Sequence, residues 1–456
     1  MRREKKDWKK FPIRKVAVYA IGSVAVIVLV CGAIFLFIPD TFINGFFKNK
    51  IIKAFAKAYP AYSIGIAGIH YNIWENRIGA DSLALTSNDS TFSCSIGAFS
   101  TKGIAWFQLL RHKGNAFKVL GGSTVDAGEI ALVFRKPHYG LRCGRLHISA
   151  PGSEIFLEAL ELRPMVDNDK FFASSAFRKT RIRINIPQCK VTGVDCRGLL
   201  QGTAYAARSI VLNDASFDVL VDMDKPYNKN SLRPLMPSEA LSSIRKIIQV
   251  NSVSIIKARL KYSERYIIGS PPAEVTFDSM RMSAEGITNH AAPGATAVIS
   301  GRGIFMKTSV MKVHMNIPLA SPEIPMRYSG SLDGMDLTRL NSFLEIGEGL
   351  RIKSGVLESA TFDITSIAGH AQGTLRAMYK DLNIAALNAL TGSEKGVLNR
   401  LASIMTNAMK IRASNMPDKS GSIKIGEVKY EKKRDDTFFQ LIWFSLRSGI
   451  GDVIGF

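Results

Sequence analysis

The sequence has little of what enzymes and metal proteins use for chemistry. It holds five cysteines and seven histidines in 456 residues, with no C-x-x-C pair, and we find no cysteine or histidine at zinc-ligand spacing. It contains no HExxH sequence, no G-x-S-x-G sequence and no Walker loop. These absences argue against a zinc enzyme, a serine hydrolase and a nucleoside triphosphatase. The sequence therefore predicts a protein that is not an enzyme and uses no cofactor.

Two short motifs resemble functional sites only weakly. Gly301-x-Gly303 precedes a strand-like run rather than a helix, which argues against a dinucleotide-binding turn. Asp222-Met223-Asp224 resembles a metal-binding D-x-D sequence. It closes a predicted strand, however, so we interpret it as a solvated strand end.

The cysteines outside the N-terminal apolar segment allow one disulfide bond. Cys189 and Cys196 could face each other across a hairpin turning at Gly193, and an oxidising compartment would permit the bond. An internal repeat, described below, instead places Cys196 in a helical turn. The favoured interpretation is that Cys94, Cys143, Cys189 and Cys196 are unpaired small hydrophobic residues.

One long stretch, Val16 to Ile38, carries no charge. As a helix it spans roughly 34 Å, enough to cross a hydrocarbon core of about 30 Å. Eight basic residues precede it, against Glu4 and Asp7. The positive-inside rule therefore predicts a cytoplasmic N-terminus, with the chain after Pro39 across the membrane. The predicted anchor residues include Val16, Tyr19, Val24, Leu29, Phe35 and Ile38.

Three other interpretations of this segment fit less well. A cleaved signal peptide has an apolar region of about 7 to 15 residues and an A-x-A-like cleavage site, whereas this run is longer and lacks the site. A lipobox needs a small residue before the cysteine, but Val30 precedes Cys31. A buried core helix rarely stays uncharged over this length. An uncleaved single-pass anchor is therefore predicted.

The chain carries a net charge of +22, of which the N-terminal tail supplies +6. Elsewhere Lys and Arg alternate with apolar residues instead of forming runs. Such a surface suits anionic lipid headgroups or acidic glycans, and nucleic acid is the other usual partner of a basic protein. Because most of the chain is predicted to lie beyond the membrane, we expect no nucleic-acid partner.

A basic amphipathic helix is predicted directly after the anchor. Apolar residues at helical spacing, Ile43, Phe47, Ile51 and Phe55, alternate with lysines. Such a helix can lie on the membrane surface or cap a sheet. Capping is favoured, since Pro60 ends the helix and strand patterns follow at once.

After Pro60 the pattern is overwhelmingly that of β-strands. Segments 181–186, 253–262, 311–317 and 360–364 alternate apolar and polar residues, and the slip at Ile256 predicts a β-bulge. Segment 423–430 alternates less regularly. Helical spacing predicts helices over 238–250 and 392–410. The pattern indicates a long antiparallel sheet with one hidden face.

A weak internal repeat joins three strand-to-turn units, at Gly103-Ile-Ala-Trp106, Gly193-Val-Asp-Cys196 and Gly334-Met-Asp-Leu337. In each unit a strand ends near a glycine and a short apolar turn follows. Repeated units of this kind suggest an elongated, solenoid-like sheet. Chance similarity among hairpin connections is the alternative.

The order of several segments resembles the AsmA-like proteins of diderm bacteria, which are related to TamB and YhdP. The matching features cover most of the chain and begin with the anchor and its basic helix. The other matching segments are Ile66 to Leu85, Leu235 to Glu264, Pro272 to Asn289, Tyr328 to Ile364 and Gly373 to Leu387.

The resemblance implies a mainly β fold: an elongated, twisted antiparallel β-groove of the bridge-like lipid-transfer type, with a few short helices and one N-terminal transmembrane helix. It implies an inner-membrane protein with its bulk in the periplasm, carrying phospholipid between inner and outer membranes. The alternative is a non-enzymatic assembly factor for outer-membrane proteins. Expected partners are membrane phospholipids and an outer-membrane or periplasmic protein.

The predicted organisation is a basic tail (1–15), the transmembrane helix (16–38), the juxtamembrane helix (39–60), two β-groove segments (61–235 and 236–392) and a C-terminal helix and strand segment (393–456). The residues expected to line the groove are apolar residues of the alternating segments. These are Ile182, Ile184, Ile186, Val253, Ile255, Leu260, Met311, Val313, Met315, Ile317, Phe362 and Ile364.

Overall fold

A computed structural model describes residues 48–72, 75–105, 120–230, 232–320, 325–387 and 411–455. The basic tail, the predicted anchor over 16–38 with its six named residues, and the predicted helix over 392–410 lie outside the described residues. Among the helices that are described, none has the length and apolar character needed to cross a membrane.

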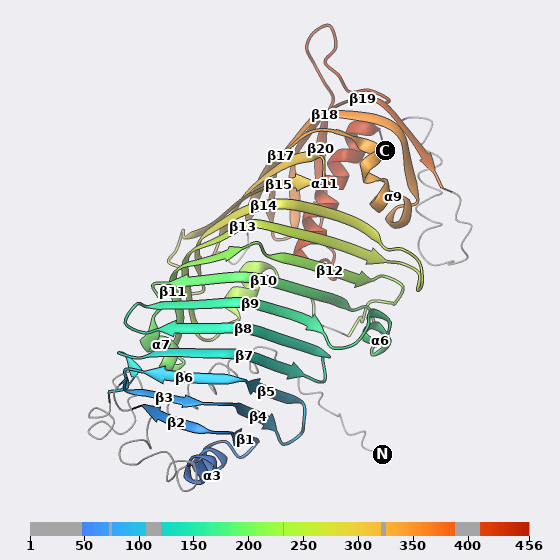
Figure 1. Cartoon of the computed structure of the whole chain (residues 1–456). Coiled ribbons are helices and arrows are strands. Elements are labelled where there is room, and N and C mark those ends of the chain that lie inside the picture. The colour runs from blue at the N-terminus through green and yellow to red at the C-terminus, as the bar shows by residue number, and fades with distance from the viewer. Residues whose placement is uncertain are drawn as a thin grey trace, which may run out of the picture. The chain divides into compact units, whose positions relative to one another are not determined.

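The described chain is mainly β, with 20 strands in a twisted mixed sheet and a few short helices (Figure 1). The antiparallel prediction is wrong at one place, because β12 (Ser216–Asp222) and β13 (Ile247–Arg265) pair in parallel. Parallel neighbours need a crossover connection of a dozen or more residues. The segment between these two strands, which includes helix α8 (Pro237–Ser242), supplies it.

The chain divides into two compact units. Unit 1 takes its described residues from Met1–Pro137, Leu141–Leu157 and Thr192–Ala206, and unit 2 from His138–Gly140, Glu158–Val191 and Ala207–Phe456. The domain boundaries predicted from the sequence stay predictions. Strands β8 (Tyr139–Ser149), β9 (Glu154–Pro164), β10 (Thr180–Thr192) and β11 (Ala204–Asn213) contribute residues to both units.

Unit 1 is a small antiparallel sheet with helix α3 (Lys48–Ala58) against its strand β1. The Phe55 side chain is buried and its ring lies 5.1 Å from that of Tyr59, so α3 covers the sheet with its apolar side. The other elements of this unit are β1 (Tyr62–Ile66), β2 (Ile69–Asn72), β3 (Arg77–Ala80), β4 (Leu83–Ser87), β5 (Phe92–Ile96), β6 (Ala98–Lys102), β7 (Thr124–Phe134) and α7 (Cys196–Gln201).

The four described cysteines are buried and form no disulfide bond with one another, as the favoured interpretation predicted. Burial raises the pKa of the Cys94 thiol to about 11, so this thiol is protonated at neutral pH. Cys196 begins the short helix α7, in agreement with the repeat. Asp195 caps that helix by accepting a hydrogen bond from the Gly198 N–H at 2.9 Å.

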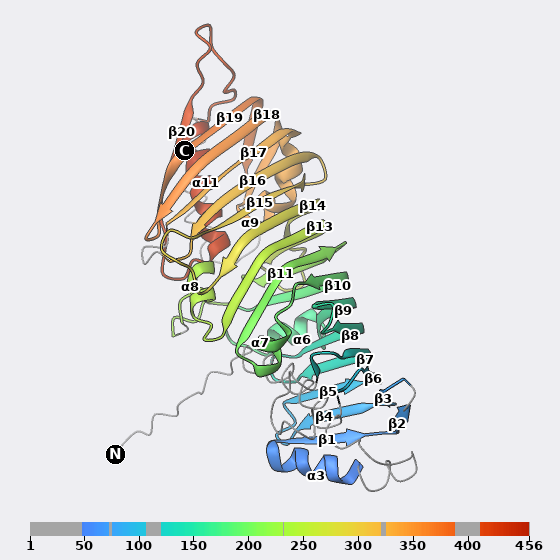
Figure 2. The ribbon, with the colours of Figure 1, turned by 90° about the vertical axis from the view of Figure 1, so that its left-hand side faces the viewer.

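Unit 2 holds the longer strands, which lie side by side from β13 to β19 (Figure 2). Its helices are α6 (Asn168–Ala173), α8, the 3₁₀ helix η2 (Leu337–Leu340), α9 (Asn341–Gly347) and α11 (Phe438–Ile454). Its remaining strands are β14 (Ala273–Thr288), β15 (Thr296–Phe305), β16 (Ser309–Pro318), β17 (Met326–Asp336), β18 (Leu350–Ile367), β19 (His370–Ala386) and β20 (Ile425–Glu431).

The alternating segments are strands, as predicted. The helix predicted over 238–250 is confirmed only at its start and is wrong from residue 243 onward. Helix α8 ends at Ser242 and β13 begins at Ile247. Ile247, Ile248 and Val250 are β-branched and suit a strand. The Asn289 side chain also fixes this junction, because its Oδ1 accepts the Ile248 N–H and its Nδ2 donates to the Ile244 and Lys246 carbonyls, all at 2.7 Å.

Helix α11 packs against β19 and β20 through a contact that only glycine allows. A Cβ atom added at Gly426 would overlap the carbonyl oxygen of Gly449 and lie 2.7 Å from Cγ2 of Val453. The helix backbone therefore approaches the strand more closely than a side chain would permit.

We expect Gly426→Ala to destabilise the protein by about 1–3 kcal/mol, because the methyl group overpacks this contact. Thermal denaturation of the full-length protein measures the effect. Gly65→Ala is the matched control, since its strand β1 offers an added Cβ no atom closer than 3.9 Å. Equal melting temperatures for both variants would show that α11 does not dock at Gly426.

Candidate lipid-binding face

The strand register of unit 2 aligns apolar residues into straight rows across neighbouring strands. Directly paired residues point to the same side of a sheet, so each row lies on one face. One row is Ile255, Met282, Gly301, Val313, Gly330, Phe362, Leu375 and Gly426; the next is Val253, Ala284, Ile299, Met315, Tyr328, Ile364, Gly373 and Val428.

A third row continues onto the strands before β13. It joins Ile184, Phe217, Leu260, Phe277 and Phe305. We call the surface that these three rows form the apolar face. It brings together candidate lining residues that the sequence predicted on β10, β13, β16 and β18.

Two β-bulges keep this face continuous. The register of β13 against β14 shifts between Ile256 and Ala258 and again before Leu260. Lys257 and Ser279 have positive φ angles of 59° and 49°, and each adds one residue to its strand. Without the extra residue, Leu260 would turn to the opposite side of the sheet from Ile255. The bulge predicted at Ile256 is confirmed.

Glycines let large side chains lie flat along the apolar face. The ring of Phe362 lies over Gly330, where an added Cβ would stand 2.5 Å from the ring atom Cζ. Val313 has glycines on both sides, Gly301 and Gly330. The side chains of Met282 and Phe362 lie over these two glycines, on either side of Val313.

Helices cover one part of the apolar face. Tyr328, Ile364 and Val428 are fully buried in a core that also contains Leu441 and Val453 of α11. The Arg447 Nη2 atom of α11 lies 3.1 Å from Oε2 of Glu348, next to α9. Figure 1 shows α9 and α11 beside strands β17 to β19.

The remainder of the face reaches solvent. Ile182 is 38% exposed. Most of the other predicted lining residues are half-buried, namely Ile184, Val253, Ile255, Leu260, Met311, Val313, Met315 and Phe362. Ile186 and Ile317 are buried, like Ile364. If all the predicted lining residues belonged to a closed core, all of them would be buried. The half-buried ones therefore form an apolar strip that water can reach.

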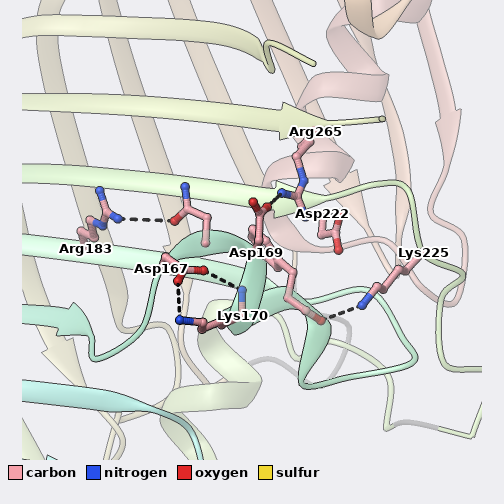
Figure 3. A network of polar contacts seen from close by, with 9 residues as sticks. Asp167, Asp169, Lys170, Arg183, Asp222, Lys225 and Arg265 are labelled. Atoms are coloured by element: carbon pink, nitrogen blue, oxygen red, sulfur yellow. Dashed lines mark hydrogen bonds and ion pairs between the residues drawn. The ribbon is translucent and has the colours of Figure 1, made fainter. Parts of the chain in front are cut away.

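A charged cluster holds helix α6 against the other face of the sheet (Figure 3). The Arg265 guanidinium lies 2.7 Å from Oδ1 of Asp169 and 3.4 Å from Oδ1 of Asp222. Its Cζ also stands 4.6 Å from the ring centroid of Phe172. Lys225 Nζ donates to the Phe172 and Ser175 carbonyls at 2.6 Å.

This cluster corrects the interpretation of the D-x-D sequence. Asp222 is 0% exposed and ion-paired, so it is not a solvated strand end, whereas Asp224 is exposed. The reason is that α6 covers the strand end through Phe171 and Phe172, which pack on Leu220. In the part of the chain that the structure describes, no three His, Cys, Asp or Glu side chains are grouped to hold a metal ion.

Sequence reasoning missed one polar site on the apolar face. The Tyr262 hydroxyl donates to Oε1 of Glu264 at 2.7 Å, and the Tyr266 hydroxyl donates to Oε2 at 2.5 Å. Burial, then the Glu264 charge, raises the pKa of Tyr262, so its hydroxyl stays a donor. The alternate spacing of these three residues is the signal that could have indicated a shared face.

A comparison with known protein families finds no match, and no curated protein matches this chain. The resemblance to AsmA-like proteins therefore stays a prediction. The evidence for function is the geometry of the apolar face.

Proposed function

We propose that this protein carries phospholipid between the inner and outer membranes, with the acyl chains against the apolar face of unit 2 and the headgroups in water. The observation that carries the proposal is the unbroken apolar rows, part of which stay half-buried. The proposal includes no enzymatic step.

The physical argument rests on the cost of moving a lipid through water. A diacyl lipid exposes roughly 30 methylenes at about 0.8 kcal/mol each, or about 24 kcal/mol in all. A continuous apolar surface removes much of that barrier at every step. Half-buried Val313, with the Met282 and Phe362 side chains that lie over the glycines on either side of it, offers an apolar surface for an extended chain.

The cellular setting of the proposal comes from the sequence. The uncharged segment 16–38 would anchor the protein in the inner membrane, with residues 1–15 in the cytoplasm and the β-rich part in the periplasm. The resemblance to AsmA-like proteins supports the same setting and adds a role in outer-membrane homeostasis.

We expect Val313→Asp to give a folded protein that retains at least fivefold less phospholipid than the wild type. The new carboxylate can be hydrated because position 313 is only half-buried, yet it interrupts the acyl path. The measurement is mass spectrometry of lipid extracted from full-length protein purified without detergent, with circular dichroism to check the fold.

The matched control is Asn316→Asp, which adds the same charge on the same strand but on the opposite side of the sheet. It should retain the wild-type amount of lipid. If Val313→Asp is folded and equally loaded with phospholipid, the apolar face does not bind acyl chains.

The described residues do not favour the assembly-factor alternative. Helix α11 covers the edge of β20 that faces away from β19, because the Glu427 and Lys429 N–H groups donate to the Asp452 and Ser448 side chains of α11. Cross-linking of the full-length protein to outer-membrane proteins, in a chain that holds no lipid, would favour this function.

A further inference from the structure

The face opposite the apolar face carries a straight row of cations. Cross-strand pairs join Arg281 to Arg302, Arg302 to Lys312, Lys312 to Ser331, Ser331 to Thr361 and Thr361 to Arg376. These six residues come from successive strands, β14 to β19, and we call them the cationic row. The row contains four cations, two hydroxyl groups and no carboxylate.

This arrangement is unfavourable for the isolated protein. Like charges directly opposite each other destabilise a sheet, and here Arg281, Arg302 and Lys312 stand side by side. All four cations are exposed. Within the described residues none of them forms an ion pair with a carboxylate.

One carboxylate beside the row is already neutralised. Asp363, in the adjacent row, accepts hydrogen bonds from Nε and Nη2 of Arg327 at 3.0 and 2.6 Å. This bidentate pair lowers the pKa of Asp363 and raises the pKa of Arg327. Asp363 therefore does not compensate the cationic row. Within the described residues no ion pair joins the row to Asp333, the exposed carboxylate two residues from Ser331 on β17, so the four cations can meet an external anion.

A hollow of about 520 Å³ lies along the row between Lys312 and Arg376. Part of its lining is Val313, Gly330, Phe362 and the ion-paired Asp363. Ser331 and Thr361 line it between the two cations, and Ser329, His314 and Thr374 line it from the adjacent row. Most of these groups can donate hydrogen bonds. The His314 Nδ1 atom lies 2.9 Å from the Ser300 hydroxyl oxygen, which orients the ring.

We propose that this hollow binds a multivalent phosphate anion. Phosphate oxygens accept hydrogen bonds from lysine, arginine and hydroxyl groups together. Lys312 and Arg376 are three strand spacings apart, about 14 Å, a gap that linked phosphoryl groups can fill when both side chains reach inward. The anion is either a soluble phosphate compound or the headgroup of a phosphorylated lipid.

The test is calorimetric titration of full-length protein in a neutral detergent with inorganic triphosphate at low ionic strength. We expect the double variant Lys312→Gln/Arg376→Gln to bind triphosphate at least tenfold more weakly than the wild type. The matched control is Lys429→Gln, because Lys429 is an exposed lysine already paired with Glu427 at 2.6 Å. It should bind within twofold of the wild type.

A second titration, in micelles that contain an anionic lipid, identifies the source of the anion. Phosphatidylglycerol added to the micelles should abolish the difference between wild type and double variant if lipid headgroups occupy the row, and should preserve it if the ligand is soluble. The proposal is overturned if the wild type binds no triphosphate in neutral micelles, or if the double variant binds as tightly as Lys429→Gln. Neither result depends on whether the apolar face binds lipid.

Discussion

Replacing Ile364 by aspartate is expected to unfold unit 2. Ile364 is 0% exposed and lies in the core formed by the apolar face and α11. A buried, unpaired charge costs several kcal/mol, and the lost apolar side chain adds a cavity. We expect a loss of more than about 4 kcal/mol, a large part of the stability of an ordinary domain. Urea denaturation followed by circular dichroism measures it.

Two controls make this result specific to the covered part of the face. Ile364→Val removes one methylene and should cost about 0.5–1.5 kcal/mol. Val313→Asp places the same charge on the same face where it is half-buried, and should stay folded. If Ile364→Asp unfolds at the same urea concentration as the wild type, α11 does not seal this surface.

The second large effect is expected at Asp222. Asp222→Ala should destabilise the protein by about 3 kcal/mol, because truncating one partner of a buried ion pair leaves the other uncompensated. Arg265 is itself buried and would keep only Asp169, whose side chain is largely exposed. Chemical denaturation of the full-length protein measures the loss.

Asp224→Ala is the matched control, two residues further along and exposed. It should change stability by less than about 0.5 kcal/mol. Asp222→Asn keeps the side-chain shape without the charge, and its loss of stability should lie between those of Asp222→Ala and Asp224→Ala. If Asp222→Ala and Asp224→Ala lower the free energy of unfolding equally, the ion pair between Asp222 and Arg265 does not form. Any loss of function in Asp222→Ala should accompany a loss of stability.

Helix α11 marks a limit of the sequence-based reasoning. Two glycines within it, Gly449 and Gly451, weaken the helical pattern. Yet Thr437 and Gln440 form a capping box at its start, a local signal that predicts a helix. The close approach to Gly426 explains Gly449. That contact forms only when the helix packs on strand β20, so the helix segment alone does not reveal it.

The sequence by itself determined the strands and their two faces. Alternation has a period of two, so Ile182 and Ile184, or Val313 and Met315, share a side wherever the strand lies. The slip at Ile256 was equally local, because one additional residue reverses the alternation within a single strand. The mainly β class follows from these patterns alone.

Only the tertiary structure decided which apolar residues are covered and which charges meet. Ile364 and Val313 look alike in the sequence, but α11 covers one and leaves the other half-buried. Asp222 is buried because α6 returns to its strand end. The cationic row exists only through the register of six strands. Strand register and the packing of helices on the sheet depend on contacts between residues distant along the chain. Alternation depends only on neighbouring residues.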